Sequence, residues 1–230
     1  MPYRLPSFKV DRTRPLRDQI YPMVRDLIIT GVIKPGDMID EKAIAAQLDI
    51  SRTPVREAVK KLSDEHLVEV VAQSATRASR MNRKEINQAF LIRRALEMES
   101  AAQAAVRMTQ EHDDQLSDIL MQHARAIERK QFIDAIAKDD RFHRYITEIS
   151  DLSLLWRSIE ISKAQLDRCR HMMLPREGQA EETLEHHRKI IRALNSRNPE
   201  TARHAMGSHL DVAYQSTIAV LEGPGTGFAQ

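Results

Sequence analysis

Apolar residues in the first part of the chain recur at the spacing of a helix face and are separated by turn residues. One such row consists of Leu16, Ile20, Val24, Leu27 and Ile28. Because residues three and four apart share one face of a helix, this row predicts a helix that ends at Gly31. The Pro35-Gly36 pair that follows predicts a turn.

Two short helices joined by a tight turn are predicted next. Asp40 is placed to cap the first of them, and Ile39 and Ile44 flank this cap as a hydrophobic staple. Ser51 is placed to cap the other, whose first turn tolerates Pro54. The apolar row of this third helix consists of Val55, Val59 and Leu62. The pattern therefore predicts a helix-turn-helix unit.

Residues 67–71 and 76–81 have the pattern of short strands and predict a small β wing. From Asn82, which opens a capping box with Glu85, the pattern is helical almost to the end of the chain. It predicts six helices, over residues 83–108, 110–130, 133–149, 152–173, 179–196 and 199–222.

These elements predict an all-α fold with a small β wing, divided into two domains. The expected divisions are a flexible arm over 1–13, a winged helix-turn-helix domain over 14–81, an antiparallel helical bundle over 82–222 and a tail over 223–230.

Composition excludes several classes of protein. The chain has 230 residues, a formal net charge of +2 and one cysteine, Cys169, which excludes an intrachain disulfide and a cysteine-based zinc finger. No stretch reaches the roughly 20 apolar residues of a membrane span, and the N-terminus has no apolar signal-peptide core. We therefore expect a cytoplasmic protein without a membrane partner. With so small a net charge, affinity for nucleic acid has to come from a local patch.

The third predicted helix carries such a patch. Arg52, Arg56 and Lys60 recur four residues apart, on the side opposite the apolar row. A helix with one cationic and one buried face fits the major groove of DNA, where arginine donates two hydrogen bonds to guanine. Thr53 is placed to reach a phosphate or a thymine methyl group. The alternative interpretation is a solvated charged face without a partner.

The segment PGDMIDEKAIAAQLDISRTPVREAVKKLSDEHLVEV resembles the winged helix-turn-helix of GntR-family bacterial transcription regulators. It shares the PG turn, the acidic-basic pair that opens the second helix, and the SRTPVRE motif. The resemblance implies binding to operator DNA, and it assigns DNA contacts to Lys42, Arg52, Thr53 and Arg56. Asp49 stands where the family often has glycine, a replacement that is tolerated because Asp enters the left-handed region readily. The wing lacks the family's usual glycine, so the resemblance assigns no contact there.

Four polar residues fall on apolar rows of the helical domain. Asp139 and His143 lie one turn apart on one helix, and His187 and His209 lie centrally on two others. One carboxylate and three imidazoles directed at a common core are typical ligands of a divalent transition metal. Burying an ionised Asp without a partner is costly, which also favours a bound cation. The alternative is ordinary core histidines with hydrogen-bond partners, whereas His204 is expected to face solvent.

The segments FLIRRALEMESAAQAA, DDRFHRYI, EHHRKIIRAL and ARHAMGSHL are similar to the FadR C-terminal (FCD) domain. Many members of that family bind a small effector and a metal held by one Asp and three His. The resemblance assigns these ligands to Asp139, His143, His187 and His209, with zinc, nickel, manganese or iron as the expected ion. It also implies a homodimer. Six predicted helices, rather than seven, favour the VanR-type branch.

Arg93 lies on the inward face of the first helix of this domain, with Ile86 and Phe90. The resemblance matches it to an arginine of the family's effector domain. A guanidinium beside a metal is suited to bind the carboxylate of an organic acid. The alternative is an ion pair with Glu97, one turn further on.

We therefore predict a cytoplasmic, nucleoid-associated regulator, a homodimeric repressor rather than an enzyme. It binds near-palindromic operator DNA, and a small organic acid bound beside the metal controls its operator affinity. Two alternatives stay open at this point: an Asp/His metalloenzyme with an N-terminal docking module, and a regulator whose signal is the metal itself. The enzyme alternative is disfavoured because the pattern gives no further inward Glu, Lys or Ser for acid-base or nucleophilic chemistry.

Overall fold

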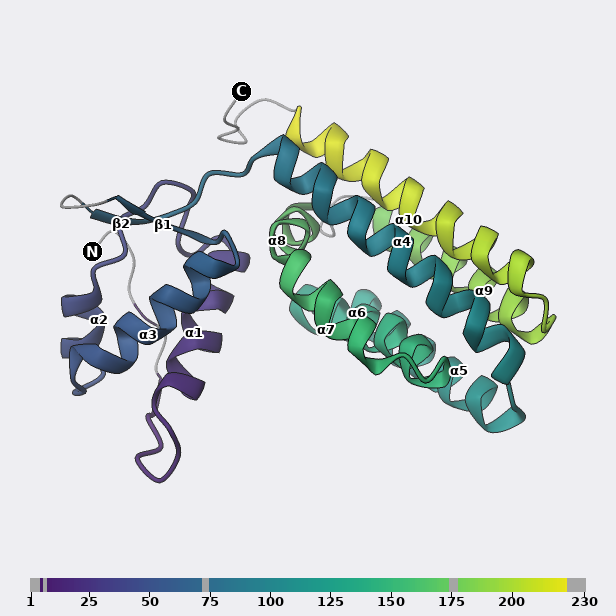
Figure 1. Cartoon of the computed structure of the whole chain (residues 1–230), viewed down its shortest axis with the longest axis horizontal. Coiled ribbons are helices and arrows are strands. Elements are labelled where there is room, and N and C mark those ends of the chain that lie inside the picture. Colours follow the sequence, from purple (N-terminus) through teal and green to yellow (C-terminus); the bar gives the residue numbers. More distant parts are fainter. Residues whose placement is uncertain (1–4, 6–7, 72–74, 174–177, 223–230) are drawn as a thin grey trace. The chain divides into compact units, whose positions relative to one another are not determined.

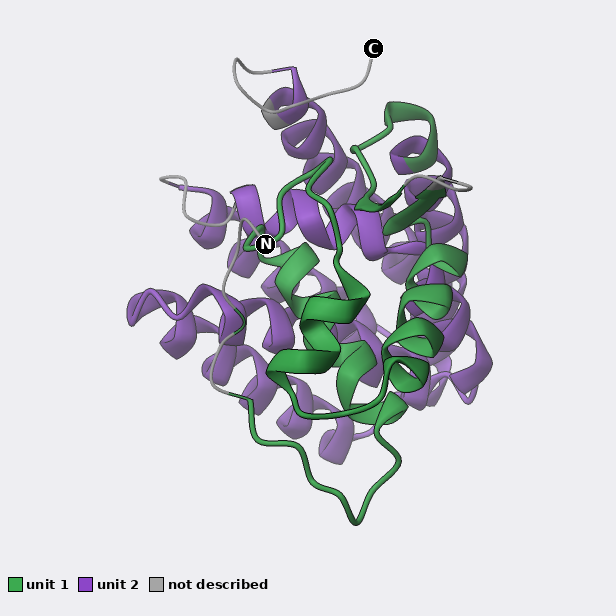
Figure 2. Ribbon diagram, turned by 90° about the vertical axis from the view of Figure 1, so that its left-hand side faces the viewer, with its two compact units in different colours: residues 1–85, 227–230 green, residues 86–226 purple. Residues whose placement is uncertain are grey.

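The structure is a computed structural model that describes residue 5 and residues 8–71, 75–173 and 178–222. The chain divides into two compact units, residues 1–85 with 227–230 and residues 86–226 (Figures 1 and 2). We call them unit 1 and unit 2. Each has a buried core of its own.

Unit 1 contains α1 (Arg17–Ile29), α2 (Glu41–Gln47), α3 (Arg52–Asp64), β1 (Val68–Val71) and β2 (Ala75–Ala78). Both α1 and α2 pack against α3. The two strands are antiparallel, with Val68 opposite Ala78, and Met38 forms an additional bridge to Arg77. The predicted helix-turn-helix and β wing are confirmed, and residues 72–74 lie outside the described residues.

The local signals in unit 1 explain where α2 begins but not where α3 begins. Asp40 caps α2, because its carboxylate accepts a hydrogen bond of 2.9 Å from the backbone N–H of Ala43. Ile39 and Ile44 are both buried, as the predicted hydrophobic staple requires. Ser51 occupies the N-cap position of α3, but its hydroxyl makes no capping hydrogen bond. The prediction that Ser51 caps this helix is therefore wrong.

The turn between α2 and α3 depends on Asp49. Its φ angle is 51°, in the left-handed region that Asp tolerates better than most residues. Arg12 donates a hydrogen bond of 2.7 Å to the Asp49 carboxylate. Part of the predicted arm thus contacts the turn, while residues 1–4 and 6–7 of that arm lie outside the described residues.

Unit 2 is built from helices, and α4 begins just before its boundary. Their bounds are α4 (Arg83–Arg107), α5 (Gln110–Glu128), α6 (Phe132–Ile149), α7 (Ser153–Ser162), α8 (Ala164–Met173), α9 (Gln179–Asn195) and α10 (Pro199–Leu221). Neighbouring helices pack as α5 on α6, α9 on α10 and α5 on α9, and α8 lies against α6 and α10. Ion pairs of Arg94 with Asp211 and of Arg203 with Glu99 join α4 to α10 (Figure 1).

The prediction of one helix over residues 152–173 is wrong. The chain breaks at Lys163 into α7 and α8, so the helical domain has seven helices within the described residues. The count of six that favoured the VanR-type branch is therefore wrong as well. The local sequence does not indicate this break, because Lys163 is neither Gly nor Pro, the residues that usually mark the end of a helix.

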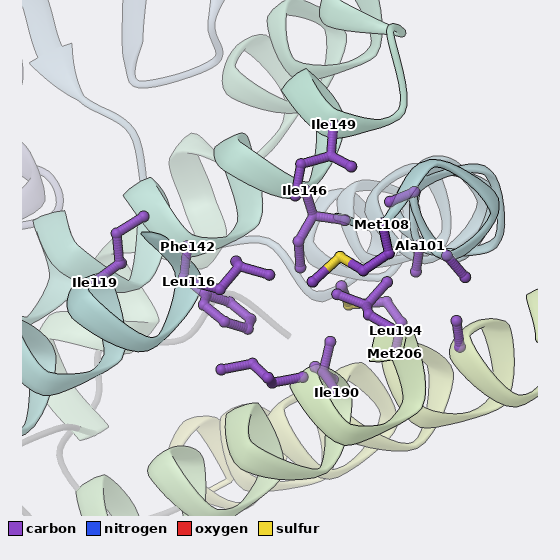
Figure 3. Packing of buried hydrophobic residues seen from close by; sticks show 14 of the residues in the cluster. Ala101, Met108, Leu116, Ile119, Phe142, Ile146, Ile149, Ile190, Leu194 and Met206 are labelled. Carbon is purple, nitrogen blue, oxygen red and sulfur yellow. The ribbon is translucent and has the colours of Figure 1, made fainter. Parts of the chain in front are cut away.

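One apolar core joins five helices of unit 2. Leu116 of α5, Phe142 and Ile146 of α6, Ile190 of α9 and Met206 of α10 belong to it, together with alanines of α4 (Figure 3). Ala101, Ala104 and Ala105 of α4 contribute small, fully buried side chains to this core. Among the described residues, no helix has both the length and the apolar character needed to cross a membrane.

Candidate functional site

The exposed face of α3 carries the cationic residues that the sequence singled out. Arg52, Thr53 and Arg56 are exposed on α3, Lys42 is exposed on α2, and the apolar row of α3 is buried. Glu41 of α2 lies 3.8 Å from Arg52 and 3.6 Å from Arg56, measured between side-chain nitrogen and oxygen atoms. This carboxylate holds both guanidinium groups on the same face of unit 1.

The structure brings together the four polar residues that fall on apolar rows in unit 2. Asp139 and His143 project from α6, His187 from α9 and His209 from α10, and each is at most 5% exposed. Oδ1 of Asp139 lies 3.4 Å from Nε2 of His187, and Oδ2 lies 3.8 Å from Nε2 of His143. Nε2 of His143 and Nε2 of His209 are 3.2 Å apart. Three helices therefore direct one carboxylate and three imidazoles at a common point.

These residues fit a divalent transition metal. One ligand atom from each of His143, His187 and His209 lies within 4.8 Å of the others. Neither ring nitrogen of His187 has a hydrogen-bond partner within the described chain, although the residue is fully buried. An unpaired buried donor or acceptor is costly, and a metal ion would supply the missing partner. The set of three nitrogens and one oxygen is typical of zinc, nickel and iron sites.

Burial keeps two of the histidines neutral, as metal ligands must be. It lowers the pKa of His187 well below the ordinary value, although the Asp139 carboxylate acts in the opposite direction. Burial likewise lowers the pKa of His209, and the nearby His143 adds to the effect. Neutral imidazoles have a lone pair available for coordination at physiological pH.

Glu97 of α4 fixes the orientation of one imidazole. Its Oε2 lies 2.5 Å from Nδ1 of His143, and its Oε1 accepts a 2.5 Å hydrogen bond from Arg93. Burial raises the pKa of Glu97, but the Arg93 guanidinium and His143 oppose this effect and bring the pKa to about 2. An ionised Glu97 keeps the proton of His143 on Nδ1, which leaves Nε2 free to face the centre.

Arg170 of α8 is the counter-ion of Asp139. Its guanidinium contacts both Asp139 and, at 2.7 Å, Asp140. Burial raises the pKa of Asp139, but Arg170 and the surrounding histidines lower it by more, to well below the usual range. Lys163, at the break between α7 and α8, lies 2.7 Å from Asp140 and 2.8 Å from Asp167. This network of buried charges fixes α8 against α6.

A cavity lies beside the four converging residues and is lined mainly by α10, with contributions from α4, α6, α8 and α9. Its polar lining includes Arg93, Asp139, Arg170, His186 and His209. Arg93 forms the ion pair with Glu97 that the sequence offered as the alternative to an effector contact. The same arginine also lines this cavity.

Two residues of the site were not among the sequence-based candidates. His123 is buried on α5, within the row formed by Leu116, Ile119 and Ala126, so helical periodicity contained the signal for it. Arg170 gave no such signal, because its position follows from the break at Lys163. Glu97 and Lys163 are buried here as well, and each is paired with oppositely charged groups. His204 is exposed, as expected.

Comparison with known proteins places these features in a family. Residues 16–77 match the family model "Bacterial regulatory proteins, gntR family", and residues 88–212 match the model "FCD domain". The HTH-type transcriptional repressor RspR of Escherichia coli K12 is 34% identical over 90% of this chain and 91% of its own length. A probable D-xylose utilization operon transcriptional repressor of Paenarthrobacter nicotinovorans is 30% identical over 90% of this chain and 92% of its own.

Solved structures agree on the fold. The structure of E. coli McbR/YncC matches with a TM-score of 0.73 and 23% identity, over 86% of this chain and 97% of that one. A putative GntR transcriptional regulator from Rhodococcus sp. RHA1 matches with a TM-score of 0.71 and 21% identity, over 88% and 97%. With its helix-turn-helix in unit 1 and its FCD domain in unit 2, the chain belongs to the GntR family of bacterial transcription regulators, which are DNA-binding proteins and not enzymes.

Proposed function

We propose that this regulator is a homodimeric repressor whose affinity for its operator is set by a small organic acid bound beside a divalent metal in unit 2. One observation carries the proposal: Asp139, His143, His187 and His209 converge next to a cavity that is also lined by two arginines. The repressor role follows that of two relatives named as repressors, RspR and the D-xylose utilization operon repressor. The proposed location is the cytoplasm, at the operator DNA.

Unit 1 reads the operator through the exposed face of α3. Arg56 and Arg52 donate to base edges or phosphates, Thr53 contacts a phosphate or a thymine methyl group, and Lys42 of α2 contacts the backbone. All four side chains are exposed, and Glu41 restricts the two arginines. A single short helix gives little specificity, so two copies of the chain on a near-palindromic site supply the rest.

The metal is held by Asp139, His143, His187 and His209, with Glu97 as the partner of His143. When bound, a zinc, nickel, manganese or iron ion supplies a Lewis-acidic site for a carboxylate oxygen. The chain's own residues keep the donor atoms deprotonated and oriented. Burial keeps His187 and His209 neutral, and Arg170 keeps Asp139 ionised.

The effector is an anion because the cavity presents two guanidinium groups. Arg93 and Arg170 both line it, and both are buried near the centre. A carboxylate placed there bonds to a guanidinium while it approaches the ion. An effector that prefers one conformation of unit 2 shifts the populations of its conformations, and operator affinity changes with them.

Titration of operator binding with the metal separates this proposal from its alternatives. Chelator-treated protein is measured by fluorescence anisotropy on operator DNA, with and without zinc, and then with a panel of small organic acids. We expect the acid to change operator affinity only when zinc is present. A full response to zinc alone would identify the ion itself as the signal.

Variants test the residues that hold the metal. His187→Ala is expected to bind no stoichiometric zinc, whereas His204→Ala, which changes an exposed histidine of α10, keeps one ion per chain. Equal metal content in both variants would contradict the proposed centre.

A further inference from the structure

His123 of α5 is a buried histidine that the metal centre proposed above does not use. It is 1% exposed, and neither of its ring nitrogens has a hydrogen-bond partner within the part of the chain that the structure describes. A buried imidazole normally bonds through at least one nitrogen. An ion held by the other three histidines would leave His123 just as unpaired as before.

The surroundings of His123 indicate that a metal ion is its missing partner. One ligand atom each of His123, Asp139 and His187 lies within 4.8 Å of the other two, and all three residues are buried. The ring centroids of His123 and His187 are 5.5 Å apart. Because α5 packs against both α6 and α9, His123 meets Asp139 and His187 from a helix that carries none of the other proposed ligands. Two imidazoles and one carboxylate are a set that transition metals bind.

On this evidence we propose that His123, Asp139 and His187 form a second position for the metal, next to the one that includes His143 and His209. The inference rests on the proposed function, because both positions share Asp139 and His187. His187 offers nitrogens on two edges of its ring, and neither is engaged elsewhere in the described structure. Oδ1 of Asp139 lies 3.4 Å from Nε2 of His187, whereas Oδ2 contacts Arg170.

The charges of the surrounding side chains favour one ion that moves between the two positions over two ions bound at the same time. The buried network contains the cations Arg93, Lys163 and Arg170 and the carboxylates Glu97, Asp139, Asp140 and Asp167. These charges nearly balance, and buried Arg168 adds a further cation nearby, so the network has little negative charge in excess to hold two divalent ions. Two such ions at adjacent positions would repel each other and the guanidinium of Arg170.

Cobalt(II) titration of variants tests the second position. Metal-free proteins are titrated with cobalt(II) in a calorimeter, which gives the number of bound ions, and the visible absorption of the ion reports its ligands. We expect His209→Ala to keep one ion per chain, bound more weakly than in the natural protein and with an altered spectrum. The double variant His209→Ala with His123→Gln is expected to lose stoichiometric binding.

A matched control separates ligation from general damage to α5. His209→Ala is combined with His112→Gln, which changes another histidine of the same helix, and this pair is expected to behave as His209→Ala alone. Circular dichroism and thermal unfolding establish that each variant is folded. Equal cobalt affinity of His209→Ala with and without His123→Gln would overturn the second position and leave the proposed function intact. Failure of the natural protein to bind cobalt would overturn both.

A measurement that leaves His123 in place covers the case in which the double variant does not fold. The imidazole nitrogens of ¹⁵N-labelled His209→Ala are recorded by NMR during titration with zinc. We expect a His123 nitrogen to move to the chemical shift of a metal-bound imidazole at one equivalent. A His123 signal that zinc leaves unchanged, while the protein binds the ion, would refute the proposal.

Discussion

Oε2 of Glu97 on α4 lies 2.5 Å from Nδ1 of His143 on α6, and both side chains are at most 1% exposed. The contact links the helix that carries Arg93 to the helix that carries Asp139. It also selects the tautomer of His143 in which Nε2 faces His209. The carboxylate is therefore placed to act on the proposed metal centre without belonging to its ligands.

Replacing this carboxylate is expected to weaken metal binding. Glu97→Gln still accepts a hydrogen bond from His143 but lacks the negative charge of the carboxylate, so zinc affinity should fall by roughly 10- to 100-fold. Competition with a chromophoric chelator measures it. Glu99→Gln is the matched control, because Glu99 lies on the same helix and pairs with Arg203 near the surface. A variant that binds zinc as tightly as the natural protein would exclude this role.

The same carboxylate makes the stability of the metal-free protein depend on pH. Its pKa falls from 4.5 to about 2 on folding, because Arg93 and His143 outweigh the effect of burial. A lowered pKa contributes stability that is present above pH 4.5 and is lost as the pH falls toward 2, at most about 3 kcal/mol. Urea unfolding at pH 6 and pH 3 measures the difference. Glu97→Gln should show a smaller loss between these two values, and an equal loss would assign the acid sensitivity to other groups.

Arg56→Ala tests base reading by α3. If Arg56 contacts a base, the substitution should cost about 1 to 3 kcal/mol of operator binding and relax the preference at one base pair. Binding to a set of operators with single changes, measured at one salt concentration, shows both effects. An equal loss of affinity for operator and random DNA would make Arg56 a phosphate contact.

Arg170→Met tests the ion pair with Asp139. Without metal, two carboxylates of α6 lose their shared cation, and the free energy of unfolding should fall by about 3 kcal/mol. Added zinc should restore part of the loss, because the ion neutralises Asp139. Arg188→Met, which breaks an exposed pair with Glu185, is the control and should change little. A loss that zinc does not reduce would separate Arg170 from the metal centre.

Arg93→Ala tests the effector site. We expect the variant to bind metal and operator but to lose the response to the acid, whose binding should weaken by roughly 2 to 5 kcal/mol. Calorimetric titration of organic acids and operator-release assays measure the two effects. Arg94→Ala, which changes the neighbouring residue that pairs with Asp211, should respond normally. Unchanged acid affinity in Arg93→Ala would leave Arg93 only as the partner of Glu97.

Helical periodicity predicted the polar residues of α6, α9 and α10 that converge in unit 2. A polar residue on the apolar row of a helix points toward the core, so its direction can be predicted from the sequence. The same reasoning applied to α5 would have included His123, which occupies a row with Leu116 and Ile119. The inward direction of the Arg170 side chain could not be predicted in this way. Its direction depends on where the helix breaks, and both Lys163 at the break and Arg170 pair with Asp140, which lies on another helix and is invisible to local periodicity.

The break at Lys163 gives α8 an attachment unlike that of the other helices. Lys163, Asp167 and Arg168 are buried on or beside it, so charged groups as well as apolar area bind it to its neighbours. Apolar contacts do not depend on the charge of a ligand. A residue in an ion pair, in contrast, can exchange its partner for a ligand group of the same charge as that partner. A cation arriving at Asp139 or an anion arriving at Arg170 therefore competes directly with the bonds that hold this helix. If the proposed metal or acid binds at Asp139 or Arg170, we therefore expect α8 to be the helix whose position responds to it.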